Sequence, residues 1–233
     1  MTVDRLGPYV LGPNDTPENG IYTGDARELA KAIPDESVDL IFTDPVYQNI
    51  DDYHWLAETA ARVLKQNASC LTFCGLGYVP ETHKALLEGG LFYRWTLTGN
   101  YAGRKQFHGR LQVSMTMCLW YQKGKAKMYN AVGDSTTLPP VRFSRYVQSN
   151  GASWDKHPKI VRRYIAGFSP DGSIVFDPFT GGGTVPAVCK MLGRRYLAFE
   201  IDPDVAEMAR ERVRMTQMPL FVLEPEQMTL GGD

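Results

Sequence analysis

The sequence predicts an α/β protein in which a mostly parallel sheet is covered by helices on both faces. Two observations support this prediction. Short apolar runs alternate with segments of helical periodicity along the chain, and several of the apolar runs end in an acidic residue. The chain has 233 residues, which fits one large domain with a small insertion.

The strand predictions rest on short apolar runs bounded by turn residues. The clearest is VDLIFTD, in which a hydrophobic run stops abruptly at Asp44-Pro45. SIVFD and RYLAFEID stop in the same way, at Asp177-Pro178 and Asp202-Pro203. The predicted strands cover 21–25, 38–44, 69–77, 92–101, 113–122, 173–177 and 195–202.

The helix predictions rest on apolar residues three or four positions apart and on the residues that end each segment. In 52–66, the apolar side chains fall on one side of a helix, and Pro34 and Gly193 end two other helices. The predicted helices cover 26–33, 52–66, 80–90, 158–168, 184–192 and 203–217. Residues 102–112 and 123–157 lack clear periodicity, which predicts a loop or a small subdomain.

The composition excludes several classes of protein. The chain is 43% hydrophobic and 22% charged, as is ordinary for a soluble globular protein. No apolar run approaches the ~18 residues of a membrane span, and the N-terminus lacks the pattern of a signal peptide. We therefore expect a cytoplasmic protein with no membrane partner. The four cysteines lack metal or disulfide spacing, which predicts buried thiols and no metal: Cys70, Cys74, Cys118 and Cys189.

The charge distribution is strongly asymmetric although the net charge is only −1. Residues 101–163 hold twelve Lys and Arg against two acidic residues, which leaves 13 basic and 24 acidic residues for the rest of the chain. A basic loop region without a partner is one interpretation of this block. A nucleic-acid-binding surface on an otherwise acidic protein is the interpretation that we favour.

Four acidic residues follow predicted strands: Asp25, Asp44, Asp177 and Asp202. A single Asp-Pro after a strand is usually a turn or a helix start. In a parallel sheet, however, ligands bind beside the carboxyl ends of the strands, where these four carboxylates would meet. Together they predict a ligand site at that edge.

The segment VFDPFTGGGTVP (175–186) predicts a cofactor site, because its glycines would let a ligand approach the backbone closely. A Gly-rich turn alone would equally suit a phosphate, but neither G-x-G-x-x-G nor G-K-[ST] occurs. Glu200 ends the next strand, 23 residues after Asp177, where an acid can accept hydrogen bonds from both hydroxyls of a ribose. A ribose without a pyrophosphate cradle indicates S-adenosylmethionine.

At this point the sequence resembles the S-adenosylmethionine-dependent amino-methyltransferases of DNA. DPFTGGG is similar to their F-x-G-x-G motif, TDPVY to their catalytic [DNS]-P-P-[YFW] motif, and HPKIVRRYIAGF to the segment that leads into the cofactor motif. The catalytic motif comes first and the cofactor motif last, as in the permuted beta class. The resemblance implies a Rossmann-like methyltransferase fold with a circularly permuted motif order.

The resemblance also implies the residues of the site. Asp44, Pro45 and Tyr47 would form the catalytic loop, and Glu200 would hold the ribose. Val46 stands where the family has a second proline, which restores a backbone N–H and some flexibility. The other cofactor-binding residues would be Asp25 and Ala26 beside the adenine, His157 near the methionine carboxylate, and Phe179, Gly181, Gly183 and Thr184 along the methionine and ribose.

The basic block lies where the family places its DNA-contacting loops and its target-recognition segment. We expect one catalytic domain, 1–233, with this basic insertion at about 101–156. Phe107 would stack on an unpaired base or, equally, anchor the loop in the core. The DNA-contacting residues would be Arg104, Lys105, His108 and Arg110.

The expected activity is methyl transfer to an exocyclic amino group of a flipped base in DNA, with adenine N6 favoured because Asp at the first motif position mostly accompanies adenine in this family. Cytosine N4 is the alternative for the base. An inactive DNA-binding relative and an RNA or small-molecule methyltransferase are the alternative functions. The resemblance places the protein in a prokaryote or phage, in the setting of restriction-modification, and leaves a homodimer open.

Overall fold

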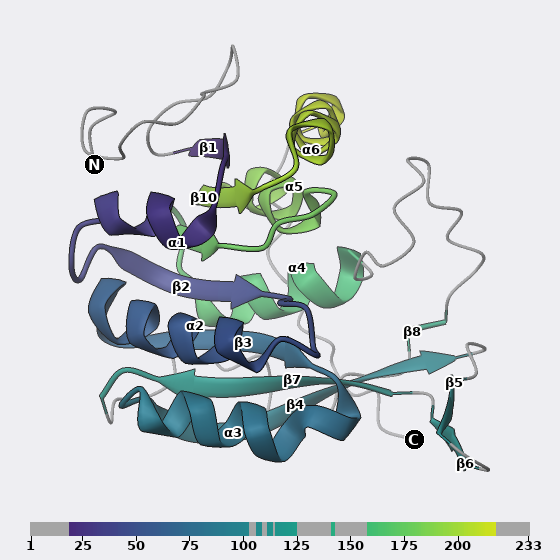
Figure 1. Ribbon diagram of the computed structural model, residues 1–233. Coiled ribbons are helices and arrows are strands. Elements are labelled where there is room, and N and C mark those ends of the chain that lie inside the picture. Colours follow the sequence, from purple (N-terminus) through teal and green to yellow (C-terminus); the bar gives the residue numbers. More distant parts are fainter. Residues whose placement is uncertain are drawn as a thin grey trace, which may run out of the picture.

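The computed structural model describes residues 19–102, 106–108, 111–113, 115–124, 141–142 and 158–217. Its centre is an eight-stranded sheet in the order β1-β10-β9-β2-β3-β7-β4-β8 (Figure 1). The strands of this sheet are β1 (Asn19–Thr23), β2 (Val38–Thr43), β3 (Leu64–Cys74), β4 (Phe92–Ala102), β7 (Met115–Gln122), β8 (Val141–Arg142), β9 (Ile174–Asp177) and β10 (Arg195–Glu200).

Five neighbouring strands, β1, β10, β9, β2 and β3, run parallel to one another, so their carboxyl ends share one edge. β7 is antiparallel to both β3 and β4, and therefore β4 also ends at that edge. A separate two-stranded ladder joins β5 (Gln106–His108) to β6 (Leu111–Val113). The prediction of a mostly parallel sheet is confirmed.

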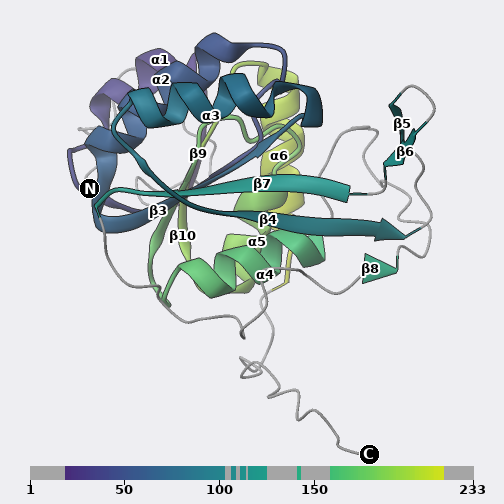
Figure 2. The ribbon, with the colours of Figure 1, turned by 90° about the horizontal axis from the view of Figure 1, so that it is seen from below.

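Helices cover both faces of the sheet, as predicted. Figure 2 shows α1, α2 and α3 above the sheet and α4 and α5 below it. Each face has its own hydrophobic core: Leu56 of α2 is buried in one, and Ile165 of α4 is buried in the other. The helices are α1 (Ala26–Leu29), α2 (Ile50–Val63), α3 (Val79–Glu88), α4 (Pro158–Phe168), α5 (Thr184–Met191) and α6 (Pro203–Met215), with short 3₁₀ helices η2 (Ala30–Ala32) and η3 (Leu76–Tyr78).

Three segments differ from the prediction. The strand predicted for 69–77 ends at Cys74, and Leu76 begins the 3₁₀ helix η3. The helix predicted for 52–66 ends at Val63, and its last three residues begin β3 instead, because Leu64 has an extended backbone (φ −65°, ψ 139°) and pairs with Val38. The loop predicted for 102–112 contains the β5–β6 ladder, since Phe107 and Gln112 face each other across it. Helical periodicity continued by chance past the true end of α2, and the ladder is too short for an alternating pattern to reveal it.

The remaining sequence-based expectations concern burial. All four cysteines are buried and free, which confirms the interpretation as internal thiols. Cys70 and Cys74 belong to the same core, because residues an even number of positions apart lie on one face of a strand. Among the described residues, no helix combines the length and the apolar character needed to cross a membrane.

Candidate active site

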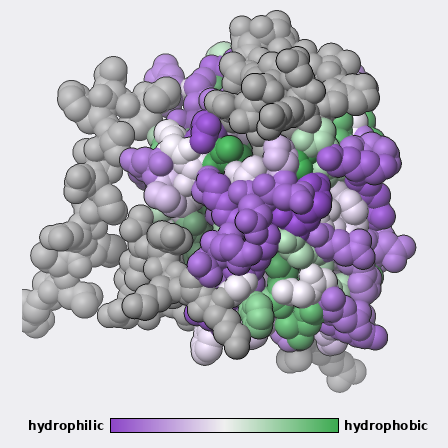
Figure 3. Space-filling view, turned by 90° about the vertical axis from the view of Figure 1, so that its left-hand side faces the viewer, coloured by the Kyte–Doolittle hydropathy of each residue, from purple (hydrophilic) through white to green (hydrophobic). Residues whose placement is uncertain are grey.

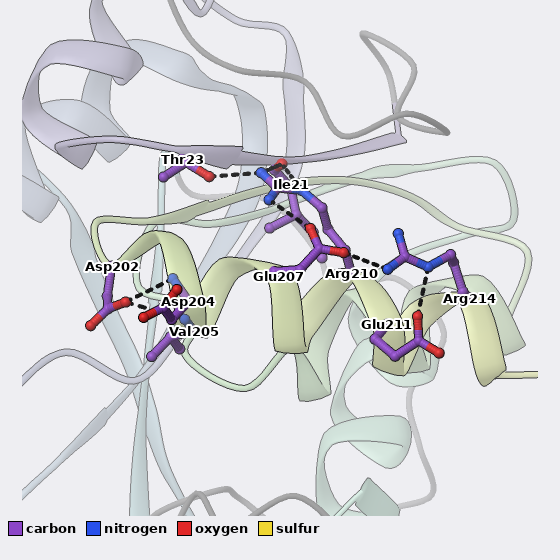
Figure 4. A network of polar contacts seen from close by, with 9 residues as sticks. All are labelled: Ile21, Thr23, Asp202, Asp204, Val205, Glu207, Arg210, Glu211 and Arg214. Atoms are coloured by element: carbon purple, nitrogen blue, oxygen red, sulfur yellow. Dashed lines mark hydrogen bonds and ion pairs between the residues drawn. The ribbon is translucent and has the colours of Figure 1, made fainter.

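Of the four acidic residues at the strand ends, two cap helices. Asp25 is the N-cap of α1 and accepts a hydrogen bond from the backbone N of Arg27 at 2.8 Å. Asp202 is the N-cap of α6 and accepts from the backbone N of Asp204 and Val205 at 2.9 and 3.2 Å (Figure 4). Both carboxylates therefore accept hydrogen bonds at a helix start, which is the usual role of an Asp that follows a strand. Asp44 directly follows the central strand β2, and Asp177 is the last residue of the central strand β9.

A buried hydrogen bond joins these two central strands where they end. The hydroxyl of Thr43 donates to Oδ1 of Asp177 at 2.7 Å, and the backbone N of Phe179 lies 3.3 Å from the same oxygen. Burial raises the pKa of Asp177 to about 7; these two hydrogen bonds act in the opposite direction, and the nearby charge of Asp44 adds to the increase. The catalytic-motif loop and the Gly-rich loop thus start side by side, 134 positions apart in the chain.

Glu200 ties the Gly-rich loop to the edge of the sheet. Its Oε2 accepts from the backbone N of Gly181 and its Oε1 from the backbone N of Asp202, both at 3.0 Å. The carbonyl of Glu200 accepts from the backbone N of Gly24 at 2.9 Å, which joins β10 to the turn after β1. Because a carboxylate oxygen can accept more than one hydrogen bond, both oxygens retain capacity for a ligand hydroxyl.

The two glycines of the predicted cofactor motif serve different purposes. Both have a positive φ, +50° at Gly181 and +77° at Gly183, which favours glycine. A Cβ on Gly183 would lie 2.8 Å from the Cβ of Ala209, so this glycine allows α6 to pack against the loop. A Cβ on Gly181 would meet no described atom within 4 Å. Gly181 therefore leaves space at the loop surface, whereas the missing side chain of Gly183 allows α6 to approach the loop.

Helix α6 holds the cofactor edge through two arginines. Arg212 donates to the carbonyl of Gly182 at 2.6 Å and to the hydroxyl of Thr184 at 2.8 Å. Arg210 is buried and donates to the carbonyl of Ile21 at 2.8 Å and to the hydroxyl of Thr23 at 2.7 Å, at the end of β1 (Figure 4). These contacts fix the Gly-rich loop and the end of β1 relative to one another.

The loop after β2 holds the predicted catalytic residues. Pro45 is buried, Asp44 and Tyr47 are partly buried, and Val46 is 67% exposed. The position that departs from the family motif therefore faces away from the packed side of the loop. Cys74 ends the neighbouring strand; burial raises its pKa to about 12, and the nearby charge of Asp44 acts in the same direction. Cys74 is consequently a neutral thiol and no nucleophile.

An aromatic pair closes one side of the Gly-rich loop. The ring of Trp55 on α2 meets the ring of Phe179 edge to face, with centroids 5.7 Å apart and planes at 78°. At the start of α2, Arg27 and Asp52 form an ion pair at 2.7 Å, and Asn49 donates to the same carboxylate. The start of α2 thus adjoins both α1 and the Gly-rich loop. Helical periodicity had placed Trp55 on α2 without indicating this contact.

Several predicted residues lie outside the described part of the chain: His157, Arg104, Lys105 and Arg110. His108 is described only as the last residue of β5. The ends of the segment can nevertheless be located, because β4 ends at Ala102 and β7 begins at Met115, both at the edge that carries Asp44 and Glu200. The first part of the basic block therefore leaves the sheet, and returns to it, on the side of the candidate site (Figure 1).

The fold of this protein also occurs in solved structures of methyltransferases. The solved structure of the M1.HpyAVI–SAM complex superimposes with a TM-score of 0.73 and 24% identity, covering 84% of this chain and 98% of that one. Two curated bacterial relatives extend the comparison. The type II methyltransferase M.HpaI of Haemophilus parainfluenzae is 26% identical, over 83% of this chain and 73% of the relative. The DNA adenine methyltransferase YhdJ of Escherichia coli is also 26% identical, over 83% and 82%.

The family assignment follows from the sequence profile of the N6_N4_Mtase family, described as DNA methylase, which matches residues 38–211. The chain belongs to this family. The resemblance stated from the two motifs is therefore confirmed, together with the Rossmann-like fold. In the chain the catalytic-motif strand β2 precedes the cofactor-motif strand β9, although the two are neighbours in the sheet, which agrees with a permuted order.

Proposed function

We propose that this protein transfers the methyl group of S-adenosylmethionine to the exocyclic amino group of a flipped base in DNA, with adenine N6 as the favoured acceptor. The observation that carries the proposal is the hydrogen bond between Thr43 and Asp177. It places the loop of Asp44, which suits an amino group, beside the loop of Gly181, which suits a methyl donor. Support for adenine comes from Asp44 at the first motif position and from the adenine-specific relative YhdJ.

The residues at the carboxyl edge fit S-adenosylmethionine. Gly181 leaves space above the backbone, and Glu200 beside it offers two carboxylate oxygens to the ribose hydroxyls. Asp25 and Ala26 begin α1 beside Glu200, since Gly24 donates to the carbonyl of Glu200. We assign the adenine side of the cofactor to that turn. Phe179, Gly183 and Thr184 shape the loop, and His157 is assigned to the methionine carboxylate on the family resemblance alone.

The catalytic loop acts on the amino group of the base. An exocyclic amino nitrogen is a weak nucleophile, because its lone pair is delocalised into the ring. Asp44 accepts one amino hydrogen and the carbonyl of Pro45 accepts the other, which favours a pyramidal nitrogen and stabilises the positive charge that develops on it. Tyr47 offers its ring for stacking the flipped base. When bound, S-adenosylmethionine would supply the methyl group from its sulfonium sulfur: the S–CH₃ bond would break as the N–CH₃ bond forms, S-adenosylhomocysteine would leave as a neutral thioether, and the amino nitrogen would release one proton to water.

The experiment is transfer of tritiated methyl groups from S-adenosylmethionine to unmethylated DNA, RNA and protein offered separately. Label in DNA supports the proposal, while label only in RNA or protein, or none at all, refutes it. Mass spectrometry of the nucleosides then identifies the base. N6-methyladenine is the expected product, and N4-methylcytosine as the main product would overturn the choice of adenine.

We further propose that the basic insertion at about 101–156 binds DNA as part of a single catalytic domain. Two observations support this proposal. Residues 101–163 are strongly basic, and the chain leaves the sheet at Ala102 and returns to it at Met115, both at the edge that carries Asp44. Replacing both Arg104 and Lys105 by Glu should reduce the slope of log affinity against log salt by about 1.8, at about 0.9 per lost phosphate contact. An unchanged slope in a folded double variant would mean that Arg104 and Lys105 do not contact DNA phosphates. His108 and Arg110 can be tested in the same way.

A further inference from the structure

Gly75 directly follows β3, at the edge that carries Asp44. Its backbone angles are φ −71° and ψ 140°, an extended conformation that every L-amino acid adopts without strain. The position therefore does not require glycine for its backbone conformation, in contrast to Gly181 and Gly183 with their positive φ. The reason for a glycine must lie in what a side chain would contact.

A side chain at position 75 would collide with Tyr47. An ideal Cβ built on Gly75 lies 2.9 Å from Cδ2, 3.1 Å from Cβ and 3.2 Å from Cγ of Tyr47. Carbon atoms normally approach to about 3.5–4.0 Å. Rotation of the ring about its own axis moves Cδ2 but leaves Cβ and Cγ in place, so this rotation cannot relieve the collision. The tyrosine would have to change its χ1 angle, or the loop would have to move.

The end of β3 lies near Asp44 as well as near Tyr47. Burial raises the pKa of Cys74 and the nearby charge of Asp44 adds to the increase, while a Cβ on Gly75 would lie within 3.2 Å of the Cβ and Cγ of Tyr47. Two residues further, Gly77 is exposed, and a Cβ there would meet no described atom within 4 Å. The close approach is thus specific to Gly75 and is not a general property of the segment between β3 and α3.

We propose that Gly75 is a positioning residue for the reaction: its missing side chain lets the ring of Tyr47 lie against the end of β3, and this fixes the surface on which the target base stacks. The inference rests on the proposed function of Tyr47. A methyl group at position 75 must displace the tyrosine by about 0.5 Å to restore ordinary contact distances. Because a misplacement of about 1 Å in an active site can cost about a hundredfold in rate, Gly75→Ala should lower the rate of methyl transfer about tenfold.

The first test observes the tyrosine directly and does not depend on activity. The protein is labelled with 3-fluorotyrosine, and among its 12 tyrosines the ¹⁹F signal of Tyr47 is assigned by its loss in Tyr47→Phe. In Gly75→Ala we expect this signal to shift while it stays in place in the control Gly77→Ala. An unmoved Tyr47 signal in Gly75→Ala would overturn the inference, whatever the rate of methyl transfer.

The second test measures whether Gly75 acts through Tyr47. Gly75→Ala should lower the rate at saturating DNA and cofactor about tenfold, leave the affinity for S-adenosylmethionine unchanged, and have little effect in a Tyr47→Ala background, where most of the collision is gone. An equal loss in both backgrounds contradicts the inference. Should Gly75→Ala lower the melting temperature, Tyr47→Ala must restore it. If the unaltered protein labels no nucleic acid while the Tyr47 signal still shifts, the proposed function fails and the contact stands.

Discussion

Acidic residues at the two edges of the parallel sheet have different partners. Asp39 lies near the start of β2, and Asp44 directly follows its end. At the edge where the strands begin, Asp39 accepts from Nζ of Lys65 at 2.6 Å and from the backbone N of Ile174 at 2.9 Å. Lys123 pairs with Glu36 at 3.1 Å on the same side. Figure 3 shows this side of the molecule, whose described surface is largely hydrophilic.

At the edge where the strands end, Asp177 and Glu200 accept hydrogen bonds from a hydroxyl and from backbone N–H groups. Such donors are neutral, so they orient the acidic side chain without forming an ion pair with it. A carboxylate paired with lysine contributes to the fold, whereas a carboxylate held by neutral donors can still serve a ligand hydroxyl or a developing positive charge. The comparison teaches that a lysine partner marks an acid that serves the fold, whereas neutral donors alone do not mark a ligand site, because Asp25 and Asp202 also accept only from backbone N–H groups and cap helices.

The largest expected effect comes from a comparison of two alanine variants, one at Asp39 near the start of β2 and one at Asp44 directly after its end. Asp44→Ala should lower methyl transfer at least about a hundredfold while S-adenosylmethionine still binds, because Asp44 acts on charge that develops during the reaction. Asp39→Ala is the matched control: it strands Lys65 and the N–H of Ile174, so it should cost about 1–3 kcal/mol of stability and leave the rate per folded molecule nearly unchanged. Activity of Asp44→Ala within about tenfold of the unaltered protein would refute its role.

The second prediction concerns the cost of holding an acid at the catalytic edge. Since burial raises the pKa of Asp177 to about 7, the folded protein keeps a proton between about pH 4 and 7 that the unfolded chain releases. Stability should therefore fall as the pH rises through this window, by at most about 1.4 kcal/mol per pH unit relative to Asp177→Asn, and should level off above it. Urea unfolding of both proteins from pH 5 to 8 measures the difference; parallel curves would show that Asp177 does not hold this proton.

Glu200 tests whether a carboxylate with neutral donors serves a ligand. Glu200→Ala should raise the dissociation constant of S-adenosylmethionine at least about tenfold, since hydrogen bonds to a charged acceptor contribute about 1.5–3 kcal/mol each. Glu200→Gln keeps the size of the side chain and one acceptor oxygen, so its loss should be smaller. Calorimetry gives both affinities, and an alanine variant that binds as tightly as the unaltered protein would place the ribose elsewhere.

The smallest effect is expected at the opposite edge. The side chain of Lys65 is 47% exposed, and exposed ion pairs contribute at most about 1 kcal/mol. Lys65→Ala should therefore change the free energy of unfolding by no more than this amount and leave methyl transfer unchanged. A loss of activity without a loss of stability would mean that the two edges are not independent.

The sequence predicted the order of the main elements well, because strands and helices bury their apolar residues at different spacings. It also placed Asp44, Tyr47 and Glu200 at strand ends, through the motifs that surround them. It did not predict which acids cap helices, since Asp44 and Asp202 stand in the same Asp-Pro context. That distinction depends on whether the following residues turn into a helix at once, as they do after Asp202.

Contacts between distant segments were the part that the sequence could not supply. Gly75 and Tyr47 are 28 positions apart, and Arg212 and Gly182 are 30 apart. Nothing in the composition around Gly75 distinguishes it from Gly77, because the difference lies in the ring that packs against it. Likewise, Arg212 has the sequence context of an exposed helix residue, and only the packing of α6 against Gly183 brings it to the Gly-rich loop.

The place of β1 in the sheet has a consequence for the synthesis of the protein. Among the described strands, β1 pairs only with β10, and the register joins Asn19 to Tyr196. Of the described strands, β1 is therefore synthesised first but can join the sheet only after β10 has been synthesised. Glu200 ends β10, so this edge of the sheet is completed only after β10 has emerged. An interrupted chain that stops before β10 would carry the catalytic loop but could not assemble a place for the methyl donor.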